Sequence, residues 1–140
     1  MAKSEPFSLR LSPGIEELVS EEARRTRRSK GAVIEALAAE ALKTRLFPGI
    51  AFRGVDWERR AWVIGTALDV WQIVDAYGDF ESVEQMAADT DCSERQIRLA
   101  LAYAERFGDE IDEMIERNRV ALDQLRARYP TIDVSSTPAG

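Results

Sequence analysis

"EPFSLRLSP", residues 5–13, alternates apolar and polar side chains over a few positions and then stops at a proline. This alternation predicts a short β-strand with its two kinds of side chain on opposite faces. The apolar face carries Phe7, Leu9 and Leu11. One strand of this length has no partner for its backbone N–H and C=O groups and cannot bury its apolar face alone. The strand therefore needs a partner.

Two helices are predicted to follow the strand. Ser12 is a suitable N-cap, and Pro13 fits the first helical position, where a missing N–H costs nothing. The basic run 24–28 interrupts the helical pattern, and Ser29 is the expected N-cap of the second helix. The apolar stripe of this second helix comprises Val33, Ile34, Leu37, Ala38, Ala41 and Leu42.

A second copy of the chain is the simplest partner for the strand. Two identical strands pair antiparallel across a twofold axis, and the helices of both copies then cover the apolar face of the ribbon. The expected core of this homodimer contains Phe7, Leu9, Leu11, Ile34 and Leu37.

The polar face of such a ribbon is suited to DNA. It presents Ser8 and Arg10 from both copies at a width that the major groove of B-DNA admits, and arginine can read a guanine edge. The second helix adds free backbone N–H groups and the positive end of its dipole, which suit a phosphate. The expected base contacts are Ser8 and Arg10, and the expected phosphate contacts are Arg27, Arg28, Ser29, Lys30 and Gly31.

The segment FSLRLSPGIEELVSEEARRTRRSKGAVIEALAAEAL, residues 7–42, resembles the ribbon-helix-helix family of bacterial repressors and antitoxins. The resemblance rests on the alternating strand that ends in Leu-Arg-Leu-Ser-Pro and on the later Arg-Ser-Lys helix start. It implies an intertwined homodimer that binds operator DNA through its ribbon. The family usually has glycine in the turn between its helices, where this chain has Arg27.

The composition argues against several other classes of protein. The chain has one cysteine, Cys92, and no histidine, which excludes an intrachain disulfide, the common zinc sites and histidine acid-base catalysis. No pair of carboxylates is isolated in an apolar setting of the kind that shifts a pKa. We therefore expect no enzyme activity, no metal and no cofactor. The lack of a membrane-length apolar run and of a secretory signal predicts a cytoplasmic protein.

The formal charge of −6 is divided unevenly along the chain. Residues 1–46 contain nine Lys and Arg against seven Asp and Glu, a net charge of +2, whereas residues 47–140 contain ten against eighteen, a net charge of −8. Such asymmetry indicates two binding roles, one of which faces an anion. The break between the two parts falls at Phe47-Pro48-Gly49.

The acidic part is predicted to begin with a β-hairpin and to continue as helices. Two short strands are expected at Ile50–Arg53 and Ala61–Ile64, joined by a polar loop. Three helix starts then share one capping signature, Asp69-x-x-Gln72, Ser82-x-x-Gln85 and Ser93-x-x-Gln96.

Residues 82–104, SVEQMAADTDCSERQIRLALAYA, have the spacing of a helix-turn-helix. Cys92 falls where a buried apolar residue is expected, so we expect a core side chain rather than a reactive thiol. The last helix offers Arg95 and Arg98, but its surroundings are acidic, and DNA affinity depends on Lys and Arg that neutralise phosphates. A protein-facing role is therefore favoured for this module.

The block from Phe47 to Glu105 resembles a small bacterial domain of unknown function found in antitoxin-like proteins. The resemblance rests on Gly65-Thr66 before Leu68-Asp69-Val70 and on the ending Ala100-Leu101-Ala102-Tyr103-Ala104. Members of that family frequently lie beside toxins of the PIN ribonuclease class, which implies a toxin-neutralising role. The family's usual Gly-Thr-Arg is Gly65-Thr66-Ala67 here, so any role of that arginine is lost.

A heptad seam follows Gly108, at alternating spacings of four and three: Ile111, Ile115, Asn118, Leu122, Leu125 and Tyr129. The seam is shorter than a dependable coiled coil, so packing onto the helix-turn-helix is favoured, and docking into a groove on a partner is the alternative. The tail 133–140 is expected to be disordered alone. If the partner is a PIN-type ribonuclease, the resemblance implies an arginine inserted into its acidic metal site; the candidates are Arg117, Arg119, Arg126 and Arg128.

Together these features predict a mainly α chain in three parts. A ribbon-helix-helix domain for DNA binding and dimerisation (1–46) is followed by a helix-turn-helix-like domain with a short β-hairpin (47–108) and by a C-terminal amphipathic helix with a flexible tail (109–140). The predicted function is that of an antitoxin and autorepressor, which binds its own operator DNA and silences a cognate toxin. The alternatives are a stand-alone transcriptional regulator whose C-terminal part oligomerises or senses a ligand, and a purely structural interaction protein.

Overall fold

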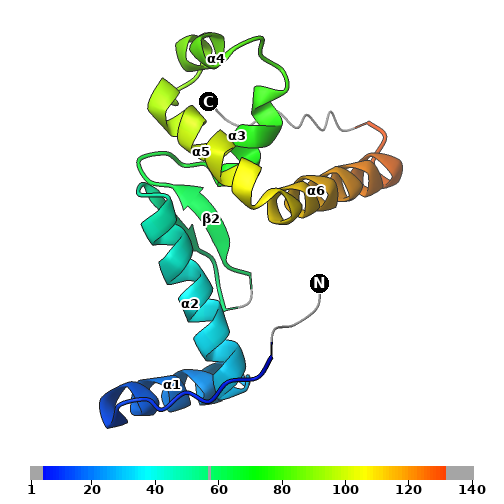
Figure 1. Cartoon of the computed structure of the whole chain (residues 1–140). Coiled ribbons are helices and arrows are strands. Elements are labelled where there is room, and N and C mark those ends of the chain that lie inside the picture. Colours follow the sequence, from blue (N-terminus) through cyan, green and yellow to red (C-terminus); the bar gives the residue numbers. More distant parts are fainter. Residues whose placement is uncertain (1–4, 57, 132–140) are drawn as a thin grey trace. The chain divides into compact units, whose positions relative to one another are not determined.

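The structure, a computed structural model, describes residues 5–56 and 58–131. Its helices and strands are labelled in Figure 1. The chain divides into two compact units, Met1–Leu42 and Lys43–Gly140, and each has its own hydrophobic cluster. The tail that was predicted to be disordered lies outside the described residues. Among the helices that the structure describes, none has the length and apolar character needed to cross a membrane.

Two helices form the first unit, and both begin where the sequence predicts. Helix α1, Pro13–Thr26, follows Ser12, which occupies the N-cap position without a side-chain hydrogen bond. Helix α2, Lys30–Leu46, follows Ser29, whose Oγ accepts a hydrogen bond from the Ala32 amide at 3.1 Å. The last four residues of α2 belong to the second unit. Both predicted helix starts are confirmed.

The turn between the two helices depends on one left-handed residue. Arg27 has a φ of 56°, and the amide of Arg28 donates to the carbonyl of Ala23 at 3.0 Å, which closes the end of α1. Glycine adopts this backbone conformation without steric cost, whereas a residue with a Cβ is strained by about 1 kcal/mol. Arg27 therefore occupies the position of the turn where glycine is most favourable, and glycine is what the ribbon-helix-helix family usually has there.

The buried core of the first unit is small. It consists of Val19, Ala23 and Val33, with Leu11 and Ile34 packed against it. Three buried hydrophobic side chains are too few to stabilise an independent domain. The first unit therefore lacks most of the core that its apolar residues would form.

The strand predicted over residues 7–11 is absent from the single chain. The described residues ahead of Pro13 form neither helix nor strand. The physical reason is that a lone strand has no partner for its backbone N–H and C=O groups. The ribbon requires a second copy of the chain, so it stays a prediction.

The second unit contains the predicted β-hairpin. Strand β1, Ile50–Arg53, pairs antiparallel with strand β2, Arg60–Val63, and Ile50 lies opposite Val63. The first strand has the predicted bounds, and the second begins and ends one residue earlier than predicted. The hairpin prediction is thus confirmed.

Asp69 ties both strands of the hairpin to the helix that follows. Its side chain is 6% exposed, and its carboxylate accepts from Arg53 Nε at 2.8 Å and from Arg60 Nε at 2.7 Å. Its backbone N–H donates to the side chain of Gln72 at 2.8 Å, as the predicted capping signature requires. Helix α3, Val70–Tyr77, begins at this point.

Three more helices follow α3: α4, Val83–Asp89, α5, Glu94–Arg106, and α6, Gly108–Arg128. The predicted caps are present at the first two of them. Ser82 Oγ accepts from the Gln85 amide at 3.0 Å, and Ser93 Oγ accepts from the Gln96 amide at 3.1 Å. The helix-turn-helix spacing is therefore realised as α4, a short connection and α5.

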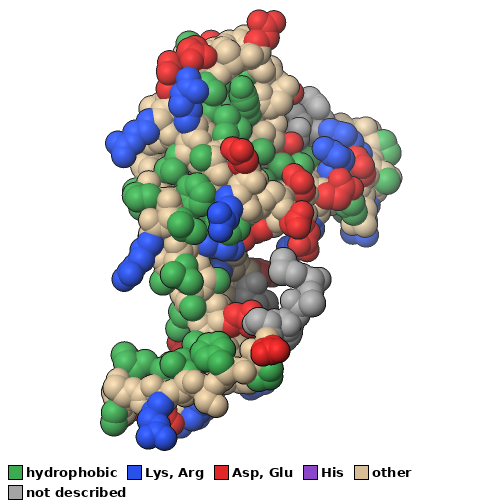
Figure 2. Space-filling model, viewed as in Figure 1, with side chains coloured by type: hydrophobic (Ala, Val, Ile, Leu, Met, Phe, Trp, Pro, Cys, Tyr) green, Lys and Arg blue, Asp and Glu red, His purple; other side chains and the backbone are tan. Residues whose placement is uncertain are grey.

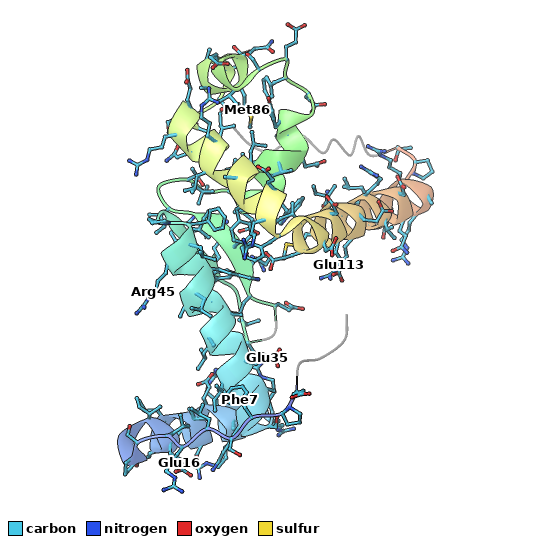
Figure 3. The ribbon with its side chains drawn as sticks, viewed as in Figure 1. Phe7, Glu16, Glu35, Arg45, Met86 and Glu113 are labelled. Carbon is cyan, nitrogen blue, oxygen red and sulfur yellow. The ribbon has the colours of Figure 1, made fainter. Side chains whose placement is uncertain are left out.

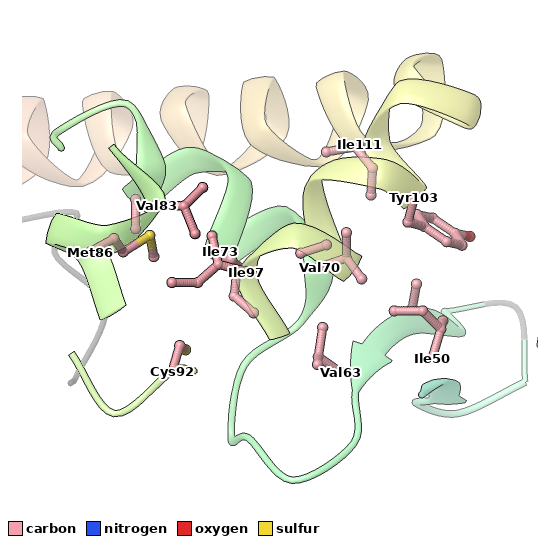
Figure 4. Close-up of a cluster of buried hydrophobic side chains, with 13 residues drawn as sticks. Ile50, Val63, Val70, Ile73, Val83, Met86, Cys92, Ile97, Tyr103 and Ile111 are labelled. Atoms are coloured by element: carbon pink, nitrogen blue, oxygen red, sulfur yellow. The ribbon is translucent and has the colours of Figure 1, made fainter. Parts of the chain in front are cut away.

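The core of the second unit gathers side chains from the hairpin and from all four helices (Figure 4). Cys92 is buried in this core, as predicted, and burial raises the pKa of its thiol. Tyr103 is also buried and donates to a Glu110 carboxylate oxygen at 2.6 Å. Burial and this carboxylate raise the pKa of Tyr103 well above its usual range. Lys43 Nζ lies 2.7 Å from the other oxygen of Glu110 and completes the network.

Helix α6 packs onto the unit through its beginning alone. Ile111 is 1% exposed and Ile115 packs against the core, but Leu125 is 39% exposed and Tyr129 is 47% exposed. Packing of the seam onto the helix-turn-helix is therefore confirmed for the start of α6 and wrong for its end. The reason is length: α6 has 21 residues, whereas α3 and α5, against which it packs, have 8 and 13.

Candidate nucleic-acid interface

The two residues predicted to contact bases are exposed. Ser8 and Arg10 both lie in the segment ahead of α1. Arg10 forms no ion pair with any residue that the structure describes, so its guanidinium is available to a ligand. A single chain does not place these two side chains on a sheet face, because the ribbon is not formed.

The start of α2 presents free backbone donors. The side chain of Ser29 accepts a hydrogen bond from the Ala32 amide. The amides of Lys30 and Gly31 have no acceptor among the described residues. A Cβ added at Gly31 would meet nothing closer than Ser29 Oγ at 4.0 Å, so no other segment crowds the Cα of this residue. Together with the positive end of the helix dipole, this is the arrangement that binds a phosphate.

The cationic side chains around this helix start are not equally available. Arg27 is exposed, whereas Arg28 is partly buried, with its Nε 3.5 Å from the Thr26 hydroxyl. Lys30 Nζ lies 3.4 Å from Glu16 Oε1 on α1, and both side chains are 56% exposed. Sequence periodicity gives no sign of this pair, because the two residues belong to different helices and meet only through the turn. Figure 3 labels Glu16 on α1, the helix that precedes this turn.

Most residues of the predicted dimer core are uncovered in the single chain. Phe7 is 83% exposed, Leu9 57% and Leu37 50%, while Leu11 and Ile34 are partly buried. The exposed large apolar side chains of the first unit are Phe7, Leu9, Ile15, Leu18, Leu37 and Leu42. Figure 2 shows hydrophobic side chains on the visible surface of α1 and α2.

The helix-turn-helix of the second unit is a poor DNA-binding surface. Residues 61–94 contain eight Asp and Glu and no Lys or Arg. Arg98, one of the three arginines on its last helix, pairs with Glu84 at 2.7 Å and approaches Glu94 at 3.8 Å. Acidic side chains gather around α4 in Figure 2. Repulsion from DNA phosphates therefore argues against a second nucleic-acid interface here.

The end of α6 is the other exposed feature of the second unit. Its charge reverses along the helix: residues 108–116 contain five acidic and no basic residues, and residues 117–128 contain four arginines and one aspartate. Arg117, Arg119 and Arg126 each lie near a carboxylate one turn away, at 2.8, 3.2 and 3.8 Å, and all three side chains are more than half exposed. The four arginines predicted to bind a toxin therefore lie on one projecting half-helix beside exposed Leu125 and Tyr129.

Comparison with protein-family models, curated proteins and solved structures finds no match to this chain. The conclusions about its function therefore rest on the arrangement of its own residues.

Proposed function

We propose that this chain is a homodimeric DNA-binding antitoxin and autorepressor of the ribbon-helix-helix class. The first unit binds operator DNA, and the acidic second unit binds a cognate toxin. The observation that carries the proposal is the imbalance in the first unit, where three hydrophobic side chains are buried and six large ones are exposed. A second copy, paired through residues 7–11, would supply the missing partner for the strand and cover these side chains.

The DNA-binding part of the proposal is supported by the distribution of charge and donors. Arg10 carries a guanidinium without an ion pair among the described residues, on the polar side of the predicted ribbon. The amides of Lys30 and Gly31, which have no acceptor among the described residues, would supply a phosphate site at the start of α2. Base reading and phosphate positioning then fall to different residues, as is usual in protein–DNA interfaces.

The toxin-binding part is supported by the projecting half of α6. This half-helix combines exposed apolar side chains with a net charge of +3, whereas the second part of the chain is acidic as a whole. A helix of this kind fits an apolar groove with an acidic rim. The acidic metal site of a PIN-type ribonuclease would have that chemistry.

The DNA-binding proposal predicts a strong effect of Arg10→Ala. A guanine contact made by arginine contributes about 1–3 kcal/mol, so the variant should bind the DNA upstream of its own gene about five- to 150-fold more weakly. Fluorescence anisotropy with that duplex and with an unrelated duplex measures the loss. Arg45→Ala is the matched control, because Arg45 is exposed and lies outside the proposed interface. Equal binding by Arg10→Ala and wild type would remove the ribbon as the reading surface.

The toxin-binding proposal predicts that charge reversal at the end of α6 breaks a complex. Replacement of Arg117, Arg119, Arg126 and Arg128 by glutamate should weaken binding to the toxin encoded beside this chain by at least about 100-fold, because like charges then face each other. Co-purification and inhibition of the toxin's ribonuclease activity are the measurements. Glutamates at Arg95 and Arg98 provide the control. Undiminished inhibition by the α6 variant would contradict this assignment, and the absence of any bound toxin would favour a stand-alone regulator.

A further inference from the structure

One ion pair in the first unit joins its two helices at the proposed phosphate site. Glu16 Oε1 lies 3.4 Å from Lys30 Nζ, although the two residues are 14 positions apart. Glu16 stands in the first turn of α1, and Lys30 is the first residue of α2. The left-handed turn at Arg27 brings them together. By contrast, the pair between Glu22 and Arg25 lies within α1.

A phosphate that binds at the start of α2 meets this carboxylate. The phosphate oxygens and Glu16 are both anionic, and both are attracted to Lys30 and to the free amides beside it. They cannot share the ammonium without mutual repulsion. Glu16 therefore weakens the contact between Lys30 and a DNA phosphate, because either the two anions repel each other beside the ammonium or Glu16 has to move away.

We propose that Glu16 competes with the DNA phosphate for Lys30. In the DNA-free chain Glu16 pairs with Lys30, and this pairing lowers the affinity for DNA. This inference rests on the proposed DNA-binding function. Glu16 is then a residue that tunes affinity, without itself contacting DNA. Its effect is modest, because an exposed ion pair contributes at most about 1 kcal/mol.

The expected result is a gain of affinity in Glu16→Gln. The variant should bind the duplex upstream of its own gene about two- to fivefold more tightly than wild type at low salt, which corresponds to the strength of an exposed ion pair. Glu17→Gln is the matched control, since it removes the same charge from the neighbouring, exposed position of α1. Fluorescence anisotropy at several salt concentrations measures both variants.

A double-mutant cycle separates this competition from a general change of charge. In a Lys30→Gln background the gain from Glu16→Gln should disappear, because the pair no longer exists. An equal gain in Glu17→Gln, or a gain that persists without Lys30, would overturn the inference. Failure of the proposed function looks different: wild type and all variants would then show no binding to the duplex. A gain in Glu16→Gln with no loss in Arg10→Ala would support the competition and contradict the ribbon.

Discussion

Replacement of Leu37 by glutamate should leave the chain monomeric at concentrations where the wild type is a dimer. Leu37 lies on α2 and is 50% exposed in the single chain, so the substitution removes little that one copy needs. In the proposed dimer its side chain is buried against the second copy, where an unpaired carboxylate costs several kcal/mol. Dimerisation should therefore weaken by at least about 100-fold. Light scattering coupled to size-exclusion chromatography measures the mass directly.

The matched control for this prediction is Val120→Glu. Val120 lies on α6 and is 45% exposed, which is close to the value for Leu37, but it is outside the proposed dimer core. This variant should keep the mass of the wild type. A dimeric Leu37→Glu variant would show that the second copy, if present, does not cover this face of α2. A monomeric wild type that nevertheless binds DNA would contradict the intertwined dimer.

Replacement of Asp69 by alanine should destabilise the second unit by about 2–3 kcal/mol. The carboxylate is buried and bonded to two guanidinium groups, and its loss leaves both arginines without their partner. The arginine side chains are 37% and 40% exposed, so water replaces part of what is lost, which keeps the value below that of a fully buried pair. The melting temperature should fall by roughly 10 °C for a unit of this size.

Tryptophan fluorescence reports on this change, because all three tryptophans lie in the second unit. Asp79→Ala provides the control, since Asp79 is an exposed carboxylate in the same unit. Its substitution should change the free energy of unfolding by less than about 0.5 kcal/mol. Equal stability of the two variants would mean that the two arginine bonds to Asp69 contribute nothing beyond a surface charge.

Local signals predicted much of the fold correctly. Ser29 and Ser93 mark real helix starts because a cap is satisfied by the amide three residues further on, within one turn of the chain. The hairpin was predictable for a similar reason, since two short apolar runs separated by a polar loop pair with each other. The burial of Cys92 followed from its place in the helix-turn-helix spacing, in the connection between α4 and α5.

The strand at residues 7–11 was not realised because its hydrogen-bond partner is not local. Alternation specifies which side chains share a face, but one chain offers no second strand to complete the sheet. The same limit applies to the candidate base contacts, Ser8 and Arg10, whose arrangement on a surface depends on the dimer. The seam of α6 shows a related limit, because its heptad spacing continues beyond the helices that cover it.

The helix caps and the hairpin could be predicted from the sequence, because each depends on residues within a few positions of one another. Three other features are visible only in the folded chain. Asp69 pairs with an arginine on each strand of the hairpin, Glu16 pairs with Lys30, and the end of α6 is left uncovered. These features depend on where turns carry distant segments and on where neighbouring helices end. Periodicity in one segment contains no information about either, because the free energy of such contacts comes from residues far away in the chain.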